Sequence, residues 1–108
     1  MQTMVAQPLT SGTPLEKWLS ILRAEKERLS RRYDVRSLGV FGSYVRGEAH
    51  PNSDLDILVD FGSPPTLFEY VRLQNDISDL LGVPVDLVMR SALKPAIGEQ
   101  VLSEVVEI

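Results

Sequence analysis

The sequence predicts a single α/β domain in which helices and short strands alternate. Its 108 residues are enough for one hydrophobic core but not for two. Three short apolar runs are typical of buried strands, and three longer segments carry apolar residues at helical spacing. We expect residues 1–12 to form a loose leader, because they are rich in Gln, Thr, Ser, Pro and Gly, and residues 13–108 to form the folded domain.

The first helix is predicted from about Pro14 to Arg32. The segment Thr13–Glu16 has the pattern of a capping box, with proline at the first helical position. Apolar residues then recur at helical spacing, which predicts that Trp18 lies in the core. These residues are Leu15, Trp18, Leu19, Leu22 and Leu29.

Two strands joined by a tight turn should follow this helix. The first strand, Val35 to Phe41, is apolar and ends at Gly42, which marks the turn. Ser43 to Glu48 is long enough for one helical turn. His50 to Ser53 breaks the chain, which makes His50 a turn residue, and Asp54 to Phe61 is the second strand.

The remaining elements are a helix, a strand and a last helix. Thr66–Glu69 repeats the capping-box pattern ahead of a helical stripe of apolar residues, and Gly82 supplies the stop. Val83 to Met89 is predicted as the third strand. Pro95 opens a final helix that we expect to end near Val105.

Composition narrows the classes of function. The net charge of -4 argues against a polynucleotide as the main substrate, because contact with phosphate backbones depends on clustered Lys and Arg. No apolar run is long enough to cross a membrane. The chain has no cysteine and no secretory signal pattern, so we expect a cytoplasmic protein without disulfides or thiolate metal sites.

Two carboxylates predict a divalent cation site. Asp54 and Asp56 are two residues apart, so in a strand both side chains project from one face while Leu55 turns to the other. Like charges about 4 Å apart repel by roughly 4 kcal/mol at an effective dielectric of about 20, and a cation relieves that repulsion. Hard oxygen ligands suit Mg²⁺, which binds through carboxylates and substrate phosphates, so a nucleoside triphosphate is the leading ligand.

A third carboxylate and a glycine–serine turn complete the candidate site. Asp86 lies inside an otherwise apolar strand, and we expect it beside the other two aspartates, where it would bind a second Mg²⁺ or accept a proton. Gly42 and Ser43 can hold phosphates through a close backbone approach, a hydroxyl and an N–H group. Arg46 can steer a triphosphate, or it can bond Glu48 or a backbone carbonyl as an exposed arginine at a helix end.

These motifs together resemble the minimal nucleotidyltransferases of the polymerase β superfamily. The resemblance rests on Val40–Ala49, Asn52–Val59, Val85–Val88 and Leu93–Pro95, and it covers about nine-tenths of the chain. Glycine–serine alone and Asp-x-Asp alone are weak evidence for this family. The evidence is specific when both motifs occur with ten residues between them and an aspartate follows in the third strand.

The resemblance implies a fold, a chemistry and a partner. The fold would be a small mixed sheet with helices mainly on one face. Mg²⁺, two ions in the expected mechanism, would be bound by Asp54, Asp56 and Asp86, and the nucleotide phosphates by Gly42 and Ser43. The protein would be the antitoxin of a helical HEPN ribonuclease toxin and would transfer AMP from ATP to a tyrosine hydroxyl of that toxin. One departure is Ala96, where many relatives carry arginine.

Two further functions stay open at this stage. A binding module could neutralise its partner by occlusion without catalysis, although the costly carboxylate cluster favours an enzyme. Transfer to a small molecule or to RNA fits less well, because the chain is short and acidic. The sequence is also compatible with a homo-oligomer.

Overall fold

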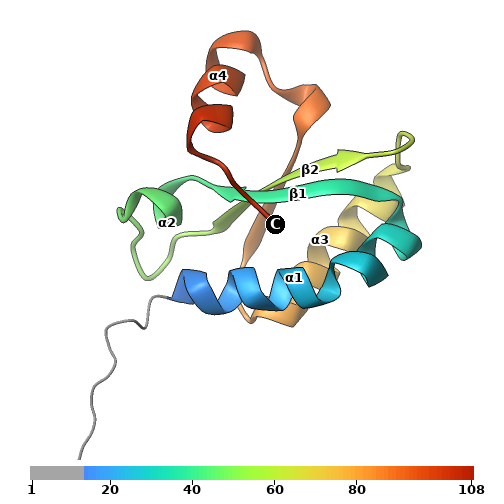
Figure 1. Ribbon diagram of the computed structural model, residues 1–108, viewed down its shortest axis with the longest axis horizontal. Helices are drawn as coiled ribbons and strands as arrows, with labels where there is room; N and C mark the ends of the chain where they lie inside the picture. Colours follow the sequence, from blue (N-terminus) through green and yellow to red (C-terminus); the bar gives the residue numbers. More distant parts are fainter. Residues whose placement is uncertain (1–13) are drawn as a thin grey trace, which may run out of the picture.

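A computed structural model describes residues 14–108 as a mixed sheet with helices on both faces (Figure 1). The predicted leader, residues 1–12, and the capping residue Thr13 lie outside the described part. The elements in order are α1 (Pro14–Tyr33), β1 (Val35–Phe41), α2 (Ser43–Arg46), β2 (Leu55–Phe61), α3 (Leu67–Leu81), β3 (Val85–Met89), a 3₁₀ turn (Arg90–Ala92), α4 (Pro95–Glu104) and β4 (Val106–Glu107). Helices α1 and α3 lie on one face and α4 on the other, which confirms the predicted mixed sheet with helices mainly on one side.

The sheet has the order β3-β2-β1-β4. β1 runs antiparallel to both β2 and β4, whereas β2 and β3 are parallel and are connected through α3. β4 was not predicted, because a strand of two residues has no periodic pattern. It pairs Val106 with Val40 and Glu107 with Gly39.

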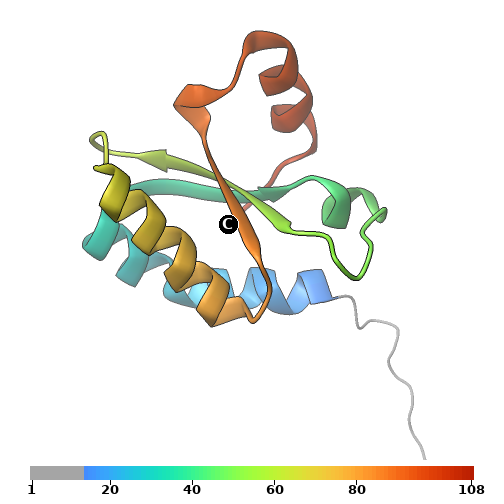
Figure 2. The ribbon, with the colours of Figure 1, turned by 180° about the vertical axis from the view of Figure 1, so that it is seen from behind.

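The main core lies between the sheet and the pair α1 and α3 (Figure 2). Trp18 is buried there, as predicted, and its indole N–H donates to the carbonyl of Leu81 at 3.2 Å. Full burial of one leucine or isoleucine side chain in this core stabilises the fold by about 1.5–3 kcal/mol. The fully buried core residues include Leu22 and Leu29 from α1, Leu55, Ile57 and Val59 from β2, and Leu73 and Ile77 from α3.

The ends of α3 confirm two local predictions. The Thr66 hydroxyl accepts from the backbone N–H of Glu69, and the Glu69 carboxylate accepts from the N–H of Thr66, so the capping box is complete. Gly82 ends the helix in the left-handed conformation and donates its N–H to Ser78. No helix formed by residues 14–108 has both the length and the apolar character needed to cross a membrane.

The outer edge of β3 is covered by side chains from α3. The backbone N–H of Leu87 donates to the Gln74 amide oxygen at 3.0 Å, and the Tyr70 hydroxyl donates to the Leu87 carbonyl. Both polar backbone groups of this edge residue are therefore paired within the chain. The same two contacts attach α3 to the strand that carries Asp86.

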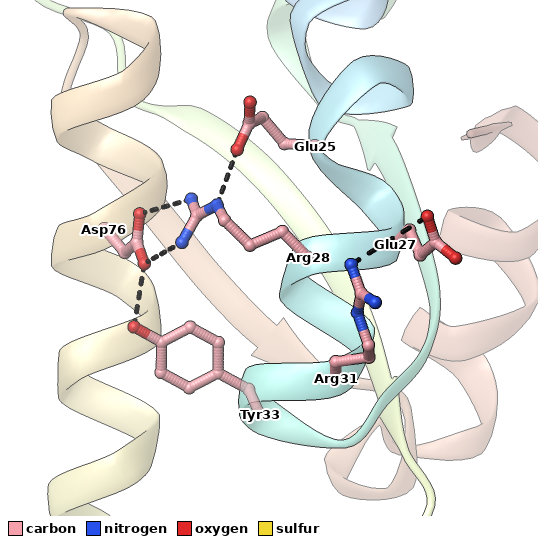
Figure 3. Close-up of polar contacts among 6 residues, drawn as sticks. All are labelled: Glu25, Glu27, Arg28, Arg31, Tyr33 and Asp76. Atoms are coloured by element: carbon pink, nitrogen blue, oxygen red, sulfur yellow. Dashed lines mark hydrogen bonds and ion pairs between the residues drawn. The ribbon is translucent and has the colours of Figure 1, made fainter.

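A polar cluster joins α1 to α3 beside the core (Figure 3). The guanidinium of Arg28 donates to both carboxylate oxygens of Asp76, at 2.9 and 3.1 Å, and also to Glu25 at 2.6 Å. The Tyr33 hydroxyl donates to Asp76 at 2.8 Å. The hydrogen bond from Arg28 is the main cause that lowers the pKa of Asp76 below its ordinary value.

The cluster predicts an acid-sensitive contribution to stability. Asp76→Asn should lower the free energy of unfolding at pH 7 by about 1–2 kcal/mol, since the pair with Arg28 is only partly buried. Because the native pKa of Asp76 is depressed, its contribution is present above the unfolded value of 3.8 and is lost as the pH falls through the native pKa. Denaturant unfolding should therefore show the difference from wild type shrinking below about pH 4. Exposed Asp79 of the same helix offers a control, and an equal loss in Asp79→Asn would contradict the assignment.

Candidate active site

Asp56 and Asp86 are direct neighbours across β2 and β3. The parallel register pairs Asp56 with Asp86, so both side chains leave the same face of the sheet. Asp54 precedes β2 by one residue, and its charge and that of Asp86 both act on Asp56. The structure thus pairs Asp56 with Asp86, and Asp54 lies near enough for its charge to act on Asp56.

Asp56 and Asp86 use the face of the sheet opposite to α1 and α3. Leu55 and Ile57, which flank Asp56 in β2, are fully buried in the main core. Strand alternation then turns Asp56 away from that core, toward the face on which α4 lies (Figure 1). Asp54 and Asp86 are exposed and Asp56 is half-buried, so solutes can reach the cluster.

The ionised form of Asp56 lies in an unfavourable electrostatic environment. Burial raises the pKa of Asp56 from 3.8 to about 6, and the negative charges of Asp86 and Asp54 add to the rise. Glu104 raises this pKa further, while Arg46 lowers it. The site therefore carries excess negative charge that a bound cation would relieve.

The turn after β1 lies directly against Asp56. Gly42 has φ 86° and ψ −157°, a backbone conformation that is nearly restricted to glycine. A Cβ atom on this residue would lie 2.0 Å from Oδ2 of Asp56. Sequence reasoning assigned the glycine to close approach of a phosphate, whereas the structure shows that its missing side chain makes room for the central carboxylate.

Ser43 begins the one-turn helix α2 next to this glycine. The Gly42 carbonyl accepts from the N–H groups of Val45 and Arg46, at 3.0 and 3.1 Å, and closes the turn. The first N–H groups of a helix have no partner within it, so the start of α2 can donate to an anion. Ser43 is half-buried and adds its hydroxyl at the same place.

Arg46 is held by two carboxylates. Its Nε donates to Glu48 at 3.0 Å, which confirms the interpretation as an arginine at a helix end that bonds Glu48. Its Nη1 donates to both oxygens of Glu104, at 3.0 and 3.2 Å. The predicted role in steering a triphosphate stays a prediction.

Glu104, the last residue of α4, was missed by sequence reasoning. Its carboxylate accepts from the backbone N–H of Gly42 at 2.7 Å as well as from Arg46. Nothing in the sequence separates this residue from Glu99 or Glu107, because a single Glu at the end of a helix has no motif around it.

Tyr44 and His50 make structural contacts close to the site in sequence. The Tyr44 ring packs edge-on against Trp18 with centroids 5.0 Å apart, and its hydroxyl donates to the Ser53 carbonyl at 3.3 Å. His50 closes the loop before Asp54, since its N–H donates to Ser53 Oγ at 2.8 Å.

The predicted metal ligands have the chemistry that a hard divalent cation prefers. All three predicted ligands, Asp54, Asp56 and Asp86, offer carboxylate oxygens, which Mg²⁺ prefers over softer ligands. Within residues 14–108, however, no three or more His, Cys, Asp or Glu side chains are already arranged to hold a metal ion. The fit therefore rests on the shared face and on the excess negative charge at Asp56.

Comparison with known proteins identifies close relatives. Residues 22–108 match the family described as nucleotidyltransferase domain. Over 92 residues, the chain is 54% identical to the protein adenylyltransferase MntA of Thermococcus cleftensis, covering 85% of this chain and 93% of that protein.

Two solved structures resemble the fold. One, described provisionally as a minimal nucleotidyltransferase, is 43% identical with a TM-score of 0.68 and covers 83% of this chain and 95% of its own. The other belongs to a toxin–antitoxin complex with AMP-PNP. It is 25% identical with a TM-score of 0.63 and covers 85% of this chain and 69% of its own.

Asp56 should titrate near pH 6 in the metal-free protein. Because its native pKa lies above the unfolded value of 3.8, the contribution of Asp56 to stability is fully present below pH 3.8 and is lost as the pH rises through about 6. A carbon NMR titration of the carboxyl in the presence of a chelator should show this midpoint, and Asp86→Asn should lower it. A midpoint near 4 in wild type would contradict the electrostatic description.

Alanine should be tolerated at Gly47 and not at Gly42. Gly47 also has positive φ, at 75°, but an added Cβ meets nothing within 4 Å, so Gly47→Ala should cost about 1–2 kcal/mol. Gly42→Ala adds a clash with Asp56, and we expect a loss of about 3 kcal/mol or more in denaturant unfolding. Equal losses in the two variants would show that Asp56 moves aside freely.

Proposed function

Because this chain belongs to the nucleotidyltransferase domain family and is therefore a nucleotidyltransferase, we propose that it transfers AMP from ATP to a hydroxyl group of a partner protein. The partner we propose is a HEPN-type toxin, modified on a tyrosine, so that the chain acts as its antitoxin. The catalytic domain would comprise residues 13–108, and the family match over residues 22–108 supports this extent.

The observation that carries the proposal is the contact between the carboxylate face and the glycine–serine turn. The antiparallel register of β1 with β2 places Phe41 opposite Asp56, so Gly42 and Ser43 follow directly beside the carboxylates. Hydrogen-bond donors that suit a phosphate and carboxylates that suit a cation therefore lie at the same edge of the sheet. A nucleotide can span both, with its phosphates at the start of α2 and its reacting phosphorus near the aspartates.

The proposed reaction is one substitution at phosphorus. The acceptor oxygen forms a bond to the α-phosphorus, the bond from that phosphorus to the bridging oxygen of the β-phosphate breaks, and pyrophosphate leaves. The acceptor's proton passes to a carboxylate, for which Asp86 is the candidate because it is exposed at the edge of the site. Ser43 holds the phosphates that depart.

Magnesium would be held by Asp54, Asp56 and Asp86. When bound, Mg²⁺ offsets the charge of the triphosphate and acidifies the attacking hydroxyl. The chain's own contribution is to keep Asp56 and Asp86 on one face, with Asp56 packed against Gly42 and Asp54 one residue before the strand. A cation would also remove the repulsion that raises the pKa of Asp56.

Two findings support a protein acceptor and a toxin partner. A relative that is 54% identical is a protein adenylyltransferase, and a structural neighbour belongs to a toxin–antitoxin complex that contains the ATP analogue AMP-PNP. The described part of the chain presents one wall of a site, on α2, β2 and β3. A partner that docks beside this wall can complete the pocket and present its hydroxyl.

Mass spectrometry of the partner tests the proposal. The chain, ATP and Mg²⁺ incubated with the purified HEPN toxin from the same organism should add mass to the toxin in steps of one AMP. Asp54→Ala with Asp56→Ala should slow the addition by about 100-fold or more, since it removes metal ligands and charge control together.

Asp60 provides the matched control, because it lies on the same face of β2 beyond the site. Asp60→Ala should transfer AMP at the wild-type rate. If the wild-type chain inhibits the toxin without adding AMP to it, the proposed catalysis is wrong and the chain acts by occlusion.

A further inference from the structure

The end of α4 is attached to the glycine–serine turn through one side chain. Glu104 accepts from the Gly42 N–H at 2.7 Å and from Arg46 at 3.0 Å, so a single carboxylate spans the residue before α2 and the last residue of α2. Its side chain is only 16% exposed. Bonds between N–H donors and a shielded carboxylate are short and stronger than neutral ones.

Glu104 is itself held on both sides. It is the last residue of α4, and the Val105 N–H that follows donates to the Val101 carbonyl at 2.9 Å. The chain then enters β4, where Val106 pairs with Val40 of β1, two residues before Gly42. The carboxylate therefore reaches the turn from a backbone anchored to the same strand that leads into the turn.

The electrostatic repulsion between Glu104 and Asp56 indicates that the Glu104 carboxylate is needed for a specific contact in the site. Glu104 adds a fourth carboxylate to Asp54, Asp56 and Asp86, and its charge repels that of Asp56. A purely apolar contact between α4 and the turn would avoid that repulsion. What the carboxylate supplies, and an apolar side chain could not, is an acceptor for the Gly42 N–H in the unusual conformation that Asp56 requires.

We propose that Glu104 is the positioning residue of the phosphate-binding turn, holding Gly42 so that Ser43 and the start of α2 face the nucleotide. This role rests on the proposed function. It also changes the role of one hydrogen-bond donor. The Gly42 N–H donates to Glu104 and not to a phosphate, which leaves the Ser43 hydroxyl and the N–H groups at the start of α2 to hold the phosphates.

Two conservative variants separate reach from charge. Glu104→Gln keeps the length of the side chain and an oxygen that accepts from Gly42, but it loses the charge. Glu104→Asp keeps the charge, but it withdraws the carboxylate by one methylene. Asp76→Asn, on the opposite side of the sheet in the cluster of Figure 3, controls for a general loss of stability.

Calorimetric titration of each variant with ATP and Mg²⁺ tests the proposal, together with the amide NMR signal of Gly42 in the absence of nucleotide. We expect Glu104→Asp to weaken ATP binding by about tenfold or more and to shift the Gly42 amide proton upfield, since small misplacements of binding groups can cost up to about 100-fold. Glu104→Gln should stay within about threefold of wild type, because its acceptor remains. Asp76→Asn should bind ATP as wild type does.

The outcomes are distinguishable. If wild type binds ATP and Glu104→Asp binds it equally well, or if Glu104→Gln is as weak as Glu104→Asp, positioning through the Gly42 N–H is overturned while the proposed function stands. An equal loss in Asp76→Asn also overturns the role, because the effect would then be one of stability. If wild type binds no ATP, the proposed function is overturned and this role with it.

Discussion

The parallel pairing of β2 with β3 determines where the two central carboxylates of the site lie. This register sets Asp56 beside Asp86 and at the same time sends Leu55 and Ile57 into the core. A shift of one residue would bury the acids and expose the apolar side chains. The packing of α1 and α3 therefore maintains the carboxylate cluster, although neither helix contributes a residue to it.

The second constraint is the contact between Gly42 and Asp56. This contact lies where β1 and β2 meet. N–H donors follow the end of β1, and the Asp56 carboxylate lies on β2. Arg46 and Glu104 lie beside this contact. Arg46 offsets part of the negative charge around Asp56, whereas Glu104 adds to it. The site is consequently built from α2, β2, β3 and α4, while α1 and α3 serve as its support.

Sequence reasoning succeeded where a period or a capping motif exists. Alternation placed Asp56 on the face opposite to the buried Leu55 and Ile57, and capping chemistry placed the ends of α3 at Thr66 and Gly82. It failed where a role depends on long-range contact alone. Glu104 meets Gly42 across 62 residues of sequence, and β4 is too short to show alternation, so neither carries a local signal. For the same reason the clash that requires glycine at position 42 is visible only in three dimensions.

The side chains that cover β3 have a further effect on how copies of this chain can associate. A strand at the rim of a sheet normally invites another strand to extend it. Here Gln74 and Tyr70 already satisfy the amide and carbonyl of Leu87. A second sheet that docks along this rim would first have to break both hydrogen bonds between Leu87 and α3. Self-assembly should therefore favour contacts between side chains over continuous intermolecular sheets.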